Sequence, residues 1–187
     1  MNSEDEAWLG WIETQKSAAK IWIEVGRPTE AIAIVQAFLD KRTSSADLER
    51  EALAFRAALF EDLGDTSKAE EDFLSAHQIA HLHGLEKYSI EISLAALFKR
   101  NGAAYKAEEW YLKALETASA DRGVSGAGAL YQLVKLRNNP SFEGREKLLA
   151  ETVIKQAWNL LELQGEPDLN QLGTSILRLL EAEQGNG

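Results

Sequence analysis

The sequence contains no cysteine, only three prolines and one methionine, and few of the β-branched residues that favour strands. Without cysteine there is no disulfide scaffold, no thiolate metal site and no cysteine nucleophile. Five valines and ten isoleucines stand against 27 alanines and 26 leucines, so strong helix formers dominate the 187 residues. This balance predicts an all-α fold.

Long apolar runs are also missing, and basic residues are fewer than acidic ones. No stretch approaches the roughly 18 apolar residues that a membrane-spanning helix needs. The first residues, Met-Asn-Ser-Glu-Asp-Glu, are acidic and no uninterrupted apolar run follows them, so no signal peptide is expected. Twenty Lys and Arg face 30 Asp and Glu, and the net charge of −10 disfavours nucleic-acid binding. We therefore expect a cytoplasmic protein with neither a membrane span nor a nucleic-acid partner.

An internal repeat is present instead. Its glycines are spaced by 38 residues and then by 38 again, at Gly26, Gly64 and Gly102. Small or aromatic residues recur at fixed offsets from each glycine. Seven before it are Ala19, Ala57 and Ala95; four before it, Trp22, Phe60 and Phe98; five after it, Ala31, Ala69 and Ala107; nine after it, Val35, Phe73 and Tyr111; and twelve after it, Phe38, Ala76 and Ala114.

These spacings are typical of a helical hairpin whose first helix ends at the glycine, which adopts positive φ without a Cβ clash. Small residues on both helices let the two backbones approach closely, while aromatic residues fill the space between units. A single hairpin cannot bury its apolar face, so several units must stack around a shared core.

The pattern resembles the tetratricopeptide repeat (TPR) family, whose units place a small residue, an aromatic, Gly, Ala, an aromatic and Ala at these offsets. The match covers about residues 12–122. The period of 38 is longer than the common 34 and resembles the extended subtype, in which the second helix gains about one turn. The resemblance implies a right-handed α–α superhelix, a TPR-like solenoid.

The expected organisation is a single domain, residues 1–187, of about four hairpins and a C-terminal capping helix. The units are expected at about 4–43, 44–84 and 85–123, followed by a degenerate unit at 124–165 and the capping helix at 167–184. Within them, capping signals predict nine helices, among them 46–63, 85–100 and 103–122. Ser44 and Ser45, which follow Thr43, should begin the helix at 46, and Ser67 with Glu70 should help to open the next one.

No catalytic residue or cofactor is expected. His77 and His81 are weak candidates for a metal site, since residues i and i+4 share a helix face, but no third ligand is evident. Acidic pairs such as Glu70-Glu71-Asp72 and Glu108-Glu109 are interpreted as solvated helix faces. The glycines at 123–128 follow a helix rather than a strand, so they are not a phosphate loop.

Two tryptophans near the N-terminus allow two interpretations. Trp8 and Trp11 lie three residues apart with no upstream unit to cover them. They either fold under the first hairpin or form an exposed end patch for a partner or a second copy. The chain is accordingly expected to be a monomer or an end-to-end homodimer.

The resemblance implies that a partner segment binds a concave groove lined by the first helix of each unit. Carried over position by position, the lining residues are Lys16, Lys20, Ile23, Ala54, Phe55, Ala58, Asp62, Ile92, Ala96, Lys99, Leu130 and Tyr131. The carboxylate clamp of chaperone-binding members is mostly missing, because Lys20, Phe55, Ser89 and Ser93 occupy four of its five positions. What remains suits a protein or peptide partner with apolar and basic residues.

Three functions follow from these features. The first is a non-catalytic protein-interaction module acting as a scaffold or adaptor. The second is a dedicated chaperone or immunity-type neutralising partner of one specific protein, which the small size and acidity favour. The third and most distant is a metal-dependent enzyme built on His77 and His81.

Overall fold

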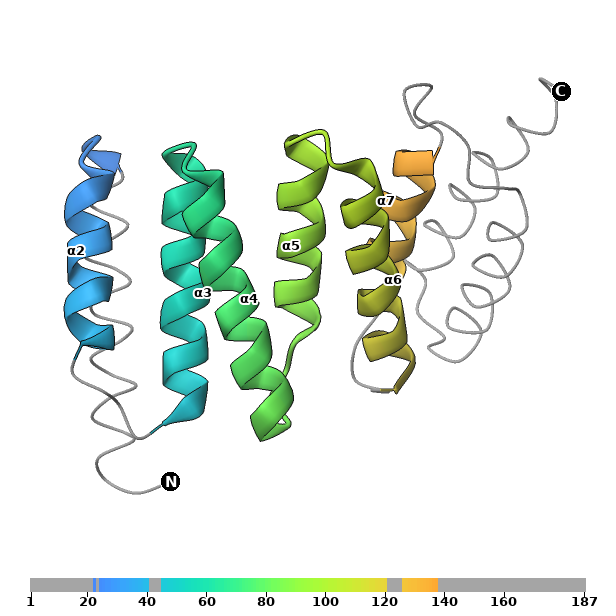
Figure 1. Ribbon diagram of the computed structural model, residues 1–187, viewed down its shortest axis with the longest axis horizontal. Helices are drawn as coiled ribbons and strands as arrows, with labels where there is room; N and C mark the ends of the chain where they lie inside the picture. The colour runs from blue at the N-terminus through green and yellow to red at the C-terminus, as the bar shows by residue number, and fades with distance from the viewer. Residues whose placement is uncertain (1–21, 23, 41–44, 121–125, 138–187) are drawn as a thin grey trace, which may run out of the picture. The chain divides into compact units, whose positions relative to one another are not determined.

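The computed structural model describes residues 22, 24–40, 45–120 and 126–137, and these residues form six α-helices and no strand. The helices are α2 (Pro28–Leu39), α3 (Ala46–Asp62), α4 (Thr66–His83), α5 (Tyr88–Arg100), α6 (Ala104–Ala120) and α7 (Ala127–Arg137) (Figure 1). The other helices expected from the sequence, including the capping helix at 167–184, lie outside the described residues. The prediction of an all-α fold is confirmed.

The chain divides into two compact units, residues 1–97 and 98–187. In the first unit, α3 packs against both α2 and α4, and a three-residue turn makes α3 and α4 an antiparallel hairpin (Figure 1). In the second unit, α6 packs against α7. Most of α5 belongs to the first unit and its last three residues to the second.

The three repeat glycines form the same turn. Gly26, Gly64 and Gly102 have φ angles of 74°, 77° and 74°. The N–H of the residue after each glycine donates to the carbonyl five residues earlier, which belongs to the repeat's aromatic residue. These bonds are Arg27 to Trp22 at 2.7 Å, Asp65 to Phe60 at 2.8 Å, and Ala103 to Phe98 at 2.9 Å. Such a bond satisfies a carbonyl of the last turn that no helical N–H can reach.

Two helix starts differ from the sequence-based expectation. The cap of α4 is Asp65, whose carboxylate accepts from the Lys68 N–H at 3.3 Å, whereas Ser67 lies inside the helix. Helix α5 begins at Tyr88, three residues later than expected, because the Glu86 carboxylate accepts from the Ser89 N–H at 2.9 Å. The expected cap of α3 is confirmed, since Ser45 accepts from the Leu48 N–H.

The core follows the repeat offsets. Ala31, Ala69 and Ala107 are fully buried. At the other repeat offsets, the buried residues are Val35, Phe38, Ala57, Phe73, Ala76, Ala95, Phe98, Tyr111 and Ala114. Trp22 and Phe60 remain partly exposed, and each carries a cation over its ring, Arg27 at 4.8 Å and Lys68 at 5.2 Å. The same device recurs at Phe98, where the Lys106 ammonium lies 4.7 Å from the ring centroid.

None of the helices in the described part of the chain has the length and apolar character needed to cross a membrane.

Candidate partner-binding surface

The predicted lining residues of the first unit lie on α3 and α5. On α3, Ala54, Phe55 and Ala58 are partly exposed and Asp62 is exposed; on α5, Ile92 and Ala96 are partly exposed. Small side chains at partly exposed positions leave room for another chain to approach the helix backbone closely. These six residues therefore have the exposure that contact with a partner requires, and their role as a groove stays a prediction.

Phe55 has a second role inside the unit. Its ring packs against the buried cluster that joins α2 to α3, which includes Val35, Phe38 and Leu59. The same ring is only partly covered. A partner that contacts Phe55 would therefore contact a side chain already held in place by the core, which lowers the entropy lost on binding.

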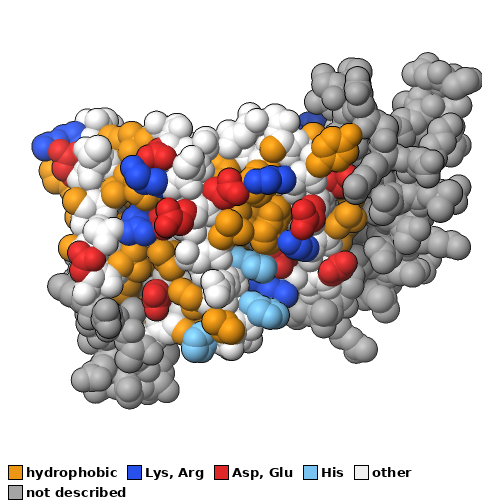
Figure 2. Space-filling view, viewed as in Figure 1, with side chains coloured by type: hydrophobic (Ala, Val, Ile, Leu, Met, Phe, Trp, Pro, Cys, Tyr) orange, Lys and Arg blue, Asp and Glu red, His pale blue; other side chains and the backbone are white. Residues whose placement is uncertain are grey.

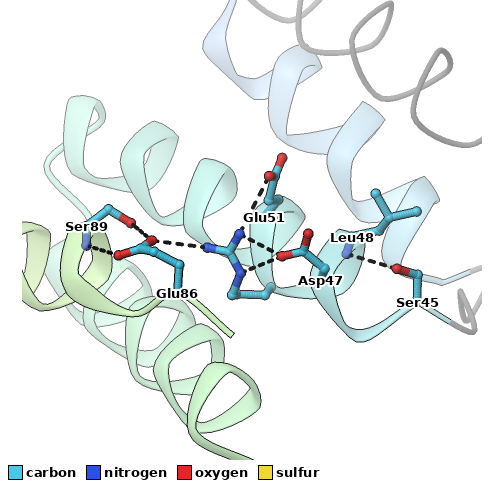
Figure 3. A network of polar contacts seen from close by, with 7 residues as sticks. Ser45, Asp47, Leu48, Glu51, Glu86 and Ser89 are labelled. Atoms are coloured by element: carbon cyan, nitrogen blue, oxygen red, sulfur yellow. Dashed lines mark hydrogen bonds and ion pairs between the residues drawn. The ribbon is translucent and has the colours of Figure 1, made fainter. Parts of the chain in front are cut away.

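The start of α3 carries a network of charged side chains around Arg50 (Figure 3). The guanidinium donates to Asp47 Oδ1 from Nε at 2.9 Å and from Nη2 at 2.7 Å. It lies 3.6 Å from a Glu51 oxygen and 4.0 Å from a Glu86 oxygen. Figure 3 shows that Glu86, which caps α5, faces α3 across this network. The arginine thus ties the loop before α5 to α3.

Charge does not balance within this network. One guanidinium, 11% exposed, meets three carboxylates that are 34–52% exposed. Two of these carboxylates, Asp47 and Glu51, lie about two turns and one turn from Ala54 on α3. Arg50 could not be predicted from the sequence, because nothing in the spacing of the repeat marks it.

The predicted residues of the second unit are placed differently. Lys99 is exposed and its ammonium donates to Gln132 Oε1 on α7 at 3.0 Å. Tyr131 is partly exposed, with the Lys135 ammonium 5.4 Å from its ring centroid. Leu130 is only 1% exposed, so it packs inside this unit and the expectation that it lines an open surface is wrong. In the sequence, the position 38 residues after Gly102 is Pro140 rather than a glycine, so offsets carried over from the regular units are less exact in the fourth unit.

Several predicted residues lie outside the described part of the chain. These are the lining residues Lys16, Lys20 and Ile23 and the proposed end patch, Trp8 and Trp11.

The two histidines singled out from the sequence do not act together. His77 Nε2 lies 3.0 Å from Glu91 Oε1 on α5, whereas His81 is exposed. Within the described residues, no three His, Cys, Asp or Glu side chains come together in a way that would hold a metal ion. The partner of His77 is a residue 14 positions away, which the spacing of His77 and His81 along one helix does not reveal.

Two of the acidic residues interpreted as solvated are in fact buried. Glu108 is buried on α6, and Asp72 is buried on α4, where it forms a bidentate pair with Arg56 of α3 at 2.7 and 2.6 Å. Arg56 also donates to Gln36 of α2, so one guanidinium joins three consecutive helices. Hydrogen bonding to Asp72 raises the pKa of Arg56. The expectation that these acidic runs are simply solvated faces is wrong for Asp72 and Glu108, since each occupies a helix face that another element covers.

The surface of the described residues is chemically mixed. Figure 2 shows acidic, basic and hydrophobic side chains interspersed on one face, with the histidine side chains near one another. Among large apolar residues, Val25, Leu63, Leu74, Leu82 and Tyr105 are exposed. Val25 and Leu63 each precede a turn glycine, so their exposure follows from the turn.

Comparison of the sequence with protein-family models and with curated proteins finds no match. Solved structures do resemble it. BtubC (BKLC) from P. vanneervenii is 21% identical, with 93% of this chain and 81% of that chain covered and a TM-score of 0.61. A Podosopora anserina protein with nearly identical TPR-like repeats of kinesin light chain type is 14% identical, with 93% of each chain covered and a TM-score of 0.60. MamA is 16% identical, with 93% of this chain and 81% of that chain covered and a TM-score of 0.52.

These likenesses and the observed hairpins show the fold. The chain has a TPR-like helical-repeat fold, as the glycine, alanine and aromatic offsets predict.

Proposed function

We propose that this chain is a non-catalytic protein-interaction module that binds a segment of a partner protein on the first helices of its repeats. The observation that carries the proposal is that small and apolar side chains at the predicted lining positions of α3 and α5, including Ala54, Ala58 and Ala96, are partly exposed; we call these positions the strip. Exposed carboxylates lie at the start of α3. Such a strip offers close backbone approach and apolar contact, and the adjacent carboxylates favour a partner with basic residues. The proposed setting is the cytoplasm, which suits a sequence with 27% charged residues.

Two uses of this surface are compatible with its chemistry. In the first, the chain is a scaffold or adaptor that several partners share. In the second, it is a dedicated chaperone or neutralising partner of one protein. The second use is favoured by a net charge of −10, which suits a single basic partner.

The test is affinity capture from the native host's soluble extract, read by mass spectrometry. The bait is the wild-type chain beside Ala96→Arg, which puts a long cation into the strip. A matched control is Gln78→Arg, which adds the same side chain at an exposed position of α4. Circular dichroism confirms that all three proteins are helical.

The outcomes separate the alternatives. Loss of one dominant partner with Ala96→Arg but not with Gln78→Arg supports the dedicated use, and loss of several partners supports the adaptor. Partners that both variants retain would place binding elsewhere and overturn the proposed surface.

A further inference from the structure

Glu91 is a carboxylate in the interior of the protein. It lies in the first turns of α5 and is 1% exposed. Its neighbours Ile90 and Leu94 are apolar core residues. Burial of an ionised carboxylate is unfavourable unless charges or hydrogen-bond donors compensate it. The groups around Glu91 therefore decide the stability of this part of the fold.

The closest group that can compensate the charge of the Glu91 carboxylate is the imidazole of His77. Oε1 lies 3.0 Å from His77 Nε2 on α4, while the Lys87 ammonium is 4.0 Å away on a side chain that is one-third exposed. Oε2 is buried, and no hydrogen-bond donor in the described part of the chain reaches it. Half of the carboxylate is thus without a donor there, and the remaining half depends on His77.

The His77–Glu91 pair links two consecutive repeats. Helix α4 is the second helix of one hairpin and α5 is the first helix of the next, so the pair joins consecutive repeats. The His77 side chain is 21% exposed, so its ring can exchange protons with solvent while its Nε2 faces Glu91. The next histidine along α4, His81, is exposed and lies one turn away.

We propose that His77 and Glu91 form a proton-responsive latch between α4 and α5. Protonated His77 gives the buried carboxylate a charge-assisted hydrogen bond and a counter-charge. Neutral His77 gives at most one N–H and no charge, so Glu91 is then under-compensated and the α4–α5 contact loosens.

The direction of the pH dependence follows from linkage. A contact that needs the protonated imidazole stabilises the fold at acidic pH and weakens as the pH rises. Besides His77, the charged group facing Glu91 among the described contacts is Lys87. His81 on the same helix is the reference position, since its side chain is exposed.

The experiment is thermal unfolding of wild type, His77→Gln and His81→Gln from about pH 5.5 to about pH 8.5, a range that spans imidazole ionisation. Wild type should exceed His77→Gln in midpoint temperature by about 2–4 °C more at the acidic end than at the basic end. His81→Gln should run parallel to wild type. A His77→Gln curve parallel to wild type, or an equal effect of His81→Gln, would overturn the latch.

The variant Glu91→Gln and hydrogen exchange in wild type test the proposal in two further ways, so that it can still be tested if one variant does not fold. Glu91→Gln keeps the volume of the side chain and removes its charge, so it should abolish the pH-dependent difference that His77→Gln makes. In wild type, amide hydrogen exchange in the first turns of α5, corrected for intrinsic rates, should be slower at the acidic end. Equal protection of α5 at both ends would contradict the proposal even if Glu91→Gln did not fold. Neither readout depends on a partner, so the latch and the proposed function fail separately.

Discussion

Ala31, Ala69 and Ala107 occupy the same place in three successive second helices, and none has exposed surface. A methyl group fills the space left between two closely approaching helices, so a larger side chain must push them apart. Ala69→Leu and Ala107→Leu should each lower the free energy of unfolding by about 1–3 kcal/mol, measured by denaturant melts. Ala37→Leu, at an exposed position of α2, is the control and should change stability by less than about 0.5 kcal/mol. Silent variants at both buried alanines would contradict the assigned repeat register.

Gly64 tests the turn through backbone conformation alone. Its φ is 77°, and a Cβ built there meets nothing within 4 Å. Gly64→Ala should therefore cost about 1–2 kcal/mol from the left-handed conformation, without any packing term. Gly64→Asn should cost less, because asparagine tolerates this region better. Denaturant melts of the two variants check the ranking, and equal stability of wild type and Gly64→Ala would show that the turn accepts another conformation.

The sequence reveals residues that repeat and hides residues that do not. The alanines and glycines of the hairpins recur at fixed offsets, so their burial and their turns could be predicted. His77 and Asp72 each find a partner on another helix, Glu91 and Arg56, at separations of 14 and 16 residues. Spacing within one helix gives no information about these partners, because they depend on how neighbouring helices are rotated against each other.

Between elements, the strongest polar link in the described residues of the first unit joins α3 to α4. Arg56 and Asp72 side chains are 15% and 7% exposed, and their bidentate geometry holds both carboxylate oxygens. Asp72→Ala should lower the free energy of unfolding by about 2–4 kcal/mol, because it leaves a guanidinium largely buried without its counter-charge. Arg56→Met should cost a similar amount, because its stem can still pack but the Asp72 carboxylate, the more buried partner, loses its counter-charge.

A double-mutant cycle separates this pair from general damage. If the two side chains act together, Arg56→Met combined with Asp72→Ala should cost less than the sum of the single changes. Additive costs in denaturant melts would mean that the two residues contribute separately. Arg50→Met with Asp47→Ala is a matched comparison, since its carboxylate is half exposed and its coupling should stay under about 1 kcal/mol.

Helix boundaries could be predicted from the sequence where one capping residue stands alone, and not where several possible capping residues follow one another. Gly84 ends α4 with φ at 63°, as expected from the lone glycine after a run of helix formers. The start of the same helix offers Asp65, Thr66 and Ser67 in succession, and all three are good caps. Asp65 prevails because its carboxylate also accepts from the Lys68 ammonium at 2.7 Å, an interaction that a serine cannot make as strongly. Lys68 in turn lowers the pKa of Asp65.

The contact between a cation and the repeat's aromatic ring recurs in three units, although the cation does not always come from the same repeat position. Lys68 over Phe60 and Lys106 over Phe98 are separated by the same 38 residues. In the preceding unit, position 30 is a glutamate, and Arg27 takes the place over Trp22 instead. The offsets alone predicted the aromatic and not its cation, because a side chain as long as lysine or arginine reaches the ring from more than one position.

For the whole molecule, the dominant electrostatic fact is a net charge of −10. On the face of the described residues that Figure 2 shows, both signs are interspersed. The field of such a chain attracts basic partners at distances beyond direct contact. Salt shortens that reach, since the Debye length falls from about 10 Å at 0.1 M to about 3 Å at 1 M. Association with the proposed partner should therefore depend on ionic strength more than its dissociation does.

This dependence gives a measurable prediction once a partner is captured. The association rate should fall by about tenfold or more between low and high salt, while the dissociation rate changes little. Asp47→Lys should slow association further, because it reverses charge within the exposed carboxylates around Arg50. Glu116→Lys makes the same change in net charge at an exposed position of α6 and should have a smaller effect. Equal slowing by the two variants would show that net charge, rather than the carboxylates at the start of α3, steers the partner. An association rate insensitive to salt would mean that the partner is not basic.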